Sequence, residues 1–196
     1  VTAKDGIVTL TGYIGSYAGK LAAERAAKRV RGVRGVANDI DVRPMVARTD
    51  ADIVADAVRA LELRGTVPES VQAVVHAGHI TLTGHVQWLY QKREAEKAVQ
   101  HIKGSRGVFN HIAVAGGAIA RDLRHRIAGA LHRNADLDAR HIVVSVEDDV
   151  VTLTGTVTTW LQRDAAERAA ADAPGITRVD NRIVVAPPIE PVDEIC

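Results

Sequence analysis

The stretch Gly6-Ile7-Val8-Thr9-Leu10-Thr11-Gly12 decides the fold, because it returns twice along the chain. It recurs as Gly78-His79-Ile80-Thr81-Leu82-Thr83-Gly84 and as Asp149-Val150-Val151-Thr152-Leu153-Thr154-Gly155. The closing glycines Gly12, Gly84 and Gly155 are 72 and then 71 residues apart. Each is followed by a glutamate twelve residues later, a second glycine after twenty and an asparagine after twenty-six. Self-similarity at a fixed period indicates tandem repeats, so the chain is predicted to hold three copies of one small module.

The spacing of apolar residues predicts the elements of each copy. Apolar and polar residues alternate before and through the phrase, and a period of two is typical of half-buried strands. A short polar turn separates the two runs, which favours an antiparallel hairpin. A helical stripe and a third strand follow. The stripes are Ala23, Ala26, Ala27 and Val30, then Ala95, Ala98, Val99 and Ile102, then Ala166, Ala169, Ala170 and Ala173.

A further helical stripe precedes the hairpin in the second and third copies. Its residues are Ile53, Ala57, Ala60 and Leu61 in one copy and Leu123, Ile127, Ala130 and Leu131 in the other. The predicted class is α+β, with helix-strand-strand-helix-strand modules in which two helices cover a three-stranded mixed sheet. The copies are predicted at residues 1–45, 49–116 and 118–186, with a Pro-rich tail at 187–196. Copy one lacks the first helix, and we expect it to be truncated, the alternative being a second protomer that covers the same face.

Composition excludes several classes of function. The chain is 46% hydrophobic and 25% charged with a net charge of +1, and it has no run of eighteen apolar residues. A net charge near zero and the lack of stacking aromatic residues on a sheet face argue against nucleic-acid binding. Cys196 is the only cysteine, which excludes an internal disulfide framework.

Catalytic and metal-binding patterns are not found either. None of the eight histidines lies in copy one, and the pairs in the other copies lack further ligands at a familiar spacing. The chain contains no nucleophile elbow, phosphate loop or Cys/His set. We therefore predict no enzyme activity, no cofactor and no metal.

The repeated pattern resembles the BON domain. The resemblance rests on V-T-L-T-G, a glutamate in an alanine-rich helix, a helix-ending glycine and a V-x-N-x-I/V strand, and it covers about Val1 to Val185. BON proteins are bacterial, mostly associated with the cell envelope, induced by osmotic or other stress, and proposed to bind phospholipid. The resemblance implies a periplasmic location, with the cytoplasm left open because the true N-terminus is not visible. It carries no catalytic residue set.

Three groups of residues are candidates for contacts with a ligand or partner. The residues expected to bind an anionic lipid surface are Arg121, Arg124, Arg126 and Arg133, on a basic amphipathic helix of copy three. A secondary basic surface comprises Lys20, Arg25, Lys28 and Arg29, and possible interface aromatics are Tyr17, Trp88 and Trp160. The alternatives are a solvated helix and aromatics that pack between modules. Asn38, Asn110 and Asn181 are expected to satisfy backbone groups of a loop.

These observations lead to one preferred function and two alternatives. The preferred one is a non-enzymatic, stress-associated protein of envelope maintenance that binds anionic phospholipid surfaces peripherally. The second is a protein-interaction scaffold that holds itself or another envelope protein. The third is a sensor of a small ion such as potassium, a role that the resemblance to the BON domain implies for some members of that family.

Overall fold

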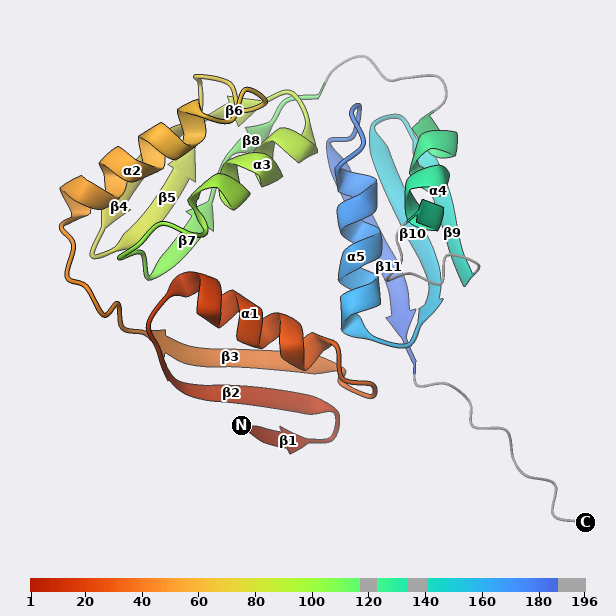
Figure 1. Ribbon diagram of the computed structural model, residues 1–196. Helices are drawn as coiled ribbons and strands as arrows, with labels where there is room; N and C mark the ends of the chain where they lie inside the picture. The colour runs from red at the N-terminus through yellow and green to blue at the C-terminus, as the bar shows by residue number, and fades with distance from the viewer. Residues whose placement is uncertain (117–122, 134–140, 187–196) are drawn as a thin grey trace, which may run out of the picture.

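The computed structural model describes residues 1–116, 123–133 and 141–186, which form three small modules around a common centre (Figure 1). Module 1 contains β1 (Thr2–Lys4), β2 (Ile7–Ile14), α1 (Tyr17–Lys28) and β3 (Gly35–Val42). Module 2 contains α2 (Asp50–Glu62), β4 (Gln72–His76), β5 (His79–Thr83), β6 (His85–Val86), α3 (Leu89–Val99), β7 (Gly107–Asn110) and β8 (Ala113–Val114). Module 3 contains α4 (Leu123–Arg133), β9 (Ile142–Glu147), β10 (Val150–Val157), α5 (Trp160–Ala171) and β11 (Arg178–Val185). The predicted α+β class is confirmed.

Each module is built on a mixed sheet with one repeated register. The sheet orders are β1-β2-β3, β4-β5-β7 and β9-β10-β11, in which the central strand is antiparallel to the strand before it and parallel to the strand after it. The leucine of the repeated phrase always stands opposite the repeated asparagine, in the pairs Leu10–Asn38, Leu82–Asn110 and Leu153–Asn181. The sequence repeat is therefore a repeat of strand register.

The glycine that closes the phrase lies within the central strand or directly after it. In modules 1 and 3 the strand continues through Gly12 and Gly155, whereas in module 2 it is interrupted at Gly84 and resumes as β6, paired with β8. All three adopt a positive φ, of +122°, +116° and +130° in chain order. At Gly84 and Gly155 a Cβ atom would overlap the carbonyl oxygen of Ser70 or His141, but at Gly12 no atom lies within 4 Å. The overlapping oxygens belong to the residues just before the first strand of the hairpin, Ser70 in module 2 and His141 in module 3.

The apolar core is concentrated in modules 2 and 3. The two first helices supply Ile53, Ala57 and Leu61 to one cluster and Leu123, Ile127 and Leu131 to the other. In module 1, α1 has no buried residue, and Val30 of its predicted stripe is 56% exposed. The prediction of a buried stripe was therefore wrong at Ala26 and Val30: α1 ends before Val30, and no first helix among the described residues covers this side of module 1.

Candidate functional site: a cationic cavity between the modules

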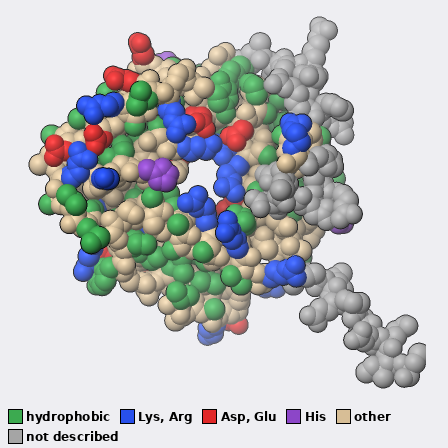
Figure 2. Space-filling model, viewed as in Figure 1, with side chains coloured by type: hydrophobic (Ala, Val, Ile, Leu, Met, Phe, Trp, Pro, Cys, Tyr) green, Lys and Arg blue, Asp and Glu red, His purple; other side chains and the backbone are tan. Residues whose placement is uncertain are grey.

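The second helix of each module, α1, α3 or α5, faces the centre of the molecule (Figure 1). An open cavity of about 580 Å³ lies between these helices, and Figure 2 shows a central opening with Lys and Arg side chains around it. The lining residues are Leu21, Glu24 and Arg25 from α1, Arg64 after α2, Arg93, Glu96, Lys97, Gln100 and His101 from α3 and its end, and Asp164 and Arg168 from α5.

Contacts between modules 2 and 3 involve both polar and apolar groups. The backbone N–H of Leu89 donates to the carbonyl of Ile176 at 2.9 Å, and the Leu89 side chain packs against the core of module 3. The guanidinium of Arg93 pairs with Asp172 at 2.9 Å and donates to the carbonyl of Arg168 at 2.7 Å. Module 2 therefore extends a leucine and an arginine from the same helix into module 3.

Module 1 closes the ring by contacts to both of its neighbours. Lys28 lies between Glu24 of its own helix and Asp164 of α5, at 2.9 Å from each carboxylate. Tyr17 reaches module 2, where burial and then the charge of Glu96 raise the pKa of Tyr17, while a hydrogen bond with the backbone of Val108 acts in the opposite direction. The three second helices thus hold the modules together and also line the cavity.

A hydrogen-bonded clamp fixes each of these helices on its sheet. The side-chain amide of Asn38, Asn110 or Asn181 donates to the glutamate of its own module, at 3.2, 3.1 and 3.0 Å respectively. The same amides donate to helix carbonyls, those of Lys20, Lys92 and Arg163. The expectation that these asparagines serve a loop was wrong for their NH2 groups, because the parallel third strand brings them beneath the second helix. It holds for the side-chain oxygen of Asn110, which accepts from the N–H of Ile112 between β7 and β8 at 3.3 Å.

The residue after each clamped glutamate is always a cation that lines the cavity. These cations are Arg25, Lys97 and Arg168, one from each module. Sequence reasoning placed Arg25 on a secondary basic surface and did not single out the other two. The signal was present in the repeat alignment, since all three stand thirteen residues after the closing glycine.

Two of these cations lack a carboxylate partner within the described residues. The Nε atom of Arg25 donates to the carbonyl of Leu21 at 3.3 Å, and that of Arg168 donates to the carbonyl of Asp164 at 3.2 Å. Lys97 forms an ion pair with Glu94 at 2.7 Å, but the same carboxylate also forms an ion pair with Arg64 at 3.1 Å. The cavity therefore has positive charge that the protein itself does not neutralise.

The pKa shifts of two neighbouring groups reflect this charge distribution. Burial lowers the pKa of Arg93, Asp172 opposes that shift, and the adjacent charge of Arg168 adds to it. Burial alone would raise the pKa of Glu24, but hydrogen bonds from Lys28 and Asn38 bring it below its ordinary value. The glutamate therefore stays ionised and committed to the clamp.

The predicted lipid-binding arginines lie on or beside α4. Arg133 is exposed, whereas Arg121 and the side chains of Arg124 and Arg126 lie outside the described residues. The apolar stripe of this helix is fully used by its own core, with Leu123, Ile127 and Leu131 at 2%, 0% and 2% exposure.

The secondary basic residues of α1 have different surroundings. Lys20 donates to the carbonyl of Ile40 at 2.8 Å, and Lys28 is held by two carboxylates. Arg25 lines the cavity, and Arg29 is exposed at the end of the helix. Of these four side chains, Lys28 is the one whose charge is paired with carboxylates among the described residues.

The candidate interface aromatics stand at or near the start of the three second helices. Tyr17 contacts module 2, and Trp88 precedes Leu89, which packs on module 3. The guanidinium of Arg163 lies 5.3 Å from the ring centre of Trp160, whose indole nitrogen is buried without a hydrogen-bond partner within the described residues.

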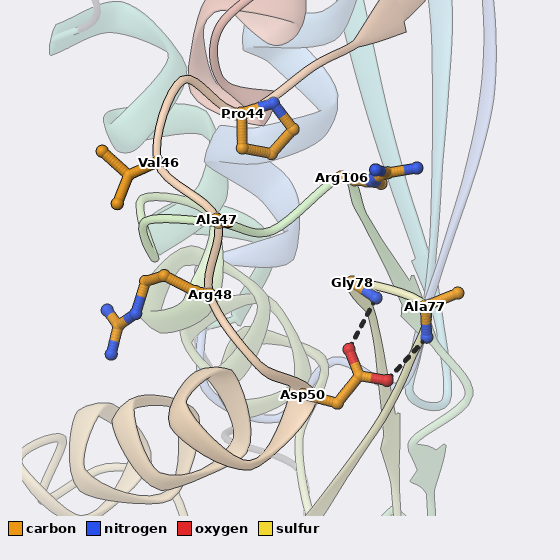
Figure 3. Close-up of a pocket in the computed structure, with 9 residues that line it drawn as sticks. Pro44, Val46, Ala47, Arg48, Asp50, Ala77, Gly78 and Arg106 are labelled. Atoms are coloured by element: carbon orange, nitrogen blue, oxygen red, sulfur yellow. Dashed lines mark hydrogen bonds between the residues drawn. The ribbon is translucent and has the colours of Figure 1, made fainter.

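A second cavity, of about 360 Å³, lies between the linker from Pro44 to Arg48 and a hairpin turn of module 2. Figure 3 shows that the carboxylate of Asp50 points at this turn, where it accepts from the N–H groups of Ala77 and Gly78 at 2.8 Å each. Arg48 is paired with Asp56 at 2.6 Å. Because these charges already serve the fold, the central cavity is the better candidate site.

Within residues 1–116, 123–133 and 141–186, no group of three or more His, Cys, Asp or Glu side chains is placed to hold a metal ion. Over the same residues, no helix is long and apolar enough to cross a membrane.

Comparisons with known proteins identify the family. Two solved structures of CdsD, a structural protein of the type III secretion system of Chlamydia trachomatis, are 16% identical, with TM-scores of 0.30 and 0.31. The matched regions cover 93% and 95% of this chain and 86% and 84% of the two CdsD chains. TM-scores this low support no inference about fold or function. No curated protein matches the sequence. The family model of the BON domain matches three times, over residues 1–44, 49–116 and 120–187, and the chain therefore belongs to the BON domain family.

Proposed function

We propose that this chain is a non-enzymatic protein of bacterial envelope maintenance under stress, which attaches peripherally to anionic phospholipid surfaces. Membership of the BON family supports a stress-associated envelope role, and lipid binding is a family-level suggestion. The attachment site in this proposal is the basic segment that includes Arg121, Arg124, Arg126 and Arg133.

The burial of the apolar stripe of α4 is the observation that defines how this attachment would work. A helix whose Leu123, Ile127 and Leu131 are packed in its own core has no apolar face left for acyl chains. Each exposed cation near an anionic headgroup contributes roughly 1 kcal/mol, and salt screens that attraction. The proposed attachment is therefore adsorption by charge, without insertion of the helix.

Co-sedimentation with vesicles tests the proposal. The parent and an Arg121, Arg124, Arg126, Arg133→Ala variant are compared on zwitterionic and anionic vesicles at low and high salt. The matched control removes four exposed arginines elsewhere, as Arg31, Arg59, Arg106, Arg178→Ala. We expect the parent and the control to sediment with anionic vesicles at low salt and the helix variant to stay in solution. Equal losses in both variants, or no sedimentation of the parent, would contradict the proposal.

A scaffold role is the second candidate, and an exposed apolar area on module 2 favours it. Val74 and Phe109 are 58% and 51% exposed, and the ring of Phe109 stacks on His79 with centroids 5.8 Å apart. The two side chains flank Thr81 on one sheet face, and exposed apolar groups of this kind suit a protein partner or a second copy of the chain. Concentration-dependent sedimentation velocity without lipid separates this candidate from the first, and Phe109→Ser is expected to abolish any association.

Potassium sensing is the weakest candidate. The lining of the central cavity carries more cations than anions, which disfavours a metal cation there. Compaction in potassium but not in sodium, measured by small-angle scattering, would revive this function.

A further inference from the structure

We propose that the central cavity is a binding site for a phosphate-bearing anion, held by Arg25, Lys97 and Arg168, one cation from each module. This inference does not depend on lipid attachment through α4, because it concerns a different face of the molecule and different residues.

The availability of the guanidinium groups is the first argument. Arg25 and Arg168 each spend the Nε atom on a carbonyl of their own helix, and within the described part of the chain neither meets a carboxylate. The terminal nitrogens of both groups therefore remain to donate to a ligand. Arginine presents these nitrogens as a planar fork that matches two oxygens of a phosphate.

The balance of charge in the lining is the second argument. Five lining residues are cations and three are anions, without His101. Ion-pair partners just outside the lining, Lys28 on one side and Glu94 and Asp172 on the other, leave a smaller surplus of positive charge, six cations against five anions. A concave surface with surplus charge of one sign concentrates the opposite charge, so an anion is the favoured occupant.

The position of the cations is the third argument. Each follows the glutamate that an asparagine clamps to the sheet, so the helix that carries it is fixed in the same way in all three modules. Arg93 adds a half-buried guanidinium beside Arg168, although Asp172 already neutralises part of its charge. Burial is the largest cause of the lowered pKa of Arg93; Asp172 opposes it, and repulsion from the charge of Arg168 adds to it. Bound phosphate would relieve that repulsion.

The size and polarity of the cavity indicate the class of ligand. A volume of about 580 Å³ falls within the range of small-molecule sites, and Leu21 is its one aliphatic lining residue. The ligand is therefore either a soluble phosphorylated molecule or the headgroup of a phospholipid, and the phosphoryl group is common to both.

Calorimetric titration with pyrophosphate, in a buffer free of other phosphates, tests the site. The cavity variant is Arg25→Gln, Lys97→Gln, Arg168→Gln, and the matched control is Arg31→Gln, Lys103→Gln, Arg178→Gln, which removes three exposed cations outside this cavity. We expect the parent and control to bind equally and the cavity variant at least about tenfold more weakly, since charge-assisted bonds to phosphate are lost. Circular dichroism checks that both variants keep their fold.

Two outcomes of the titration would overturn the proposal. If the parent does not bind pyrophosphate at millimolar concentrations, or if the control loses as much affinity as the cavity variant, the proposal is overturned. Sedimentation of the cavity variant with anionic vesicles separates the two sources of the ligand. Retained sedimentation with lost pyrophosphate binding supports a soluble ligand, and loss of both supports a lipid headgroup. If the α4 variant still sediments with anionic vesicles, the proposed lipid site on α4 is wrong, but the pyrophosphate result for the cavity is unaffected.

Discussion

Replacing Gly84 by alanine is expected to destabilise module 2 by more than the same replacement at Gly12 destabilises module 1. The two glycines occupy equivalent places in the repeat and have nearly the same φ, +116° and +122°. They differ in their surroundings. A Cβ at position 84 would overlap the carbonyl oxygen of Ser70, whereas at position 12 it meets nothing within 4 Å. The pair therefore separates steric overlap from backbone strain.

The magnitudes follow from two contributions. A non-glycine residue at such a φ costs about 1–3 kcal/mol, offset by about 0.4–1 kcal/mol because alanine restricts the unfolded chain. This net cost applies to both variants. At Gly84 the overlap must also be relieved by moving Ser70, whose hydroxyl donates to the carbonyl of His85 at 2.7 Å. Overpacking of this kind costs about 1–3 kcal/mol more.

Native-state hydrogen exchange, resolved by strand, measures the two effects separately. We expect amides of β4 and β5 to lose about 2–4 kcal/mol of protection in Gly84→Ala, and amides of β2 and β3 to lose about 1–2 kcal/mol in Gly12→Ala. Urea unfolding in a Trp160→Phe background, with Trp88 as the reporter of module 2, gives an independent value. Equal losses in the two variants would refute the argument from overlap with Ser70.

Three other predictions concern the clamp, the ion pair and the module interface. Asn110→Leu leaves the carboxylate of Glu96 without its donor, so we expect a loss of about 1–3 kcal/mol in the unfolding free energy of module 2, measured by urea denaturation. Because the pKa of Glu24 is lowered on folding, its contribution to stability is present above its ordinary value of 4.5 and is lost as the pH falls through the folded value. In Lys28→Gln, the melting temperature should fall less between pH about 6 and pH 3 than it does in the parent, as measured by thermal melts. The same dependence of melting temperature on pH in both proteins would contradict the role of Lys28. Leu89→Ala should lower the unfolding midpoint reported by Trp160, because Leu89 packs on the core of module 3, at a cost of about 1–2 kcal/mol for a half-buried leucine. No change in that midpoint would show that the interface does not stabilise module 3.

Local elements could be predicted because each is encoded by neighbouring residues. Alternation through the repeated phrase predicted β2, β5 and β10, and the apolar stripes predicted both kinds of helix. Where prediction failed, the cause was the end of a helix, or packing or strand pairing between segments that are far apart in the sequence. Val30 was predicted to continue the helical stripe, but α1 ends at Lys28 and Val30 is exposed beyond its end. The side-chain amide of Asn38 was expected to serve a loop, but the parallel pairing of β2 with β3 places it beneath α1, where it donates to a helix carbonyl.

The sequence by itself determined the module and its number of copies, because the repeat fixes which residues alternate and which lie four apart. It also contained Arg25, Lys97 and Arg168 at one repeat position. Only the tertiary structure decided that these cations face one cavity, because that outcome depends on how three folded modules dock. Docking is set by contacts between residues far apart in the chain, such as Lys28 with Asp164 and Leu89 with Ile176, and no local pattern encodes such pairs.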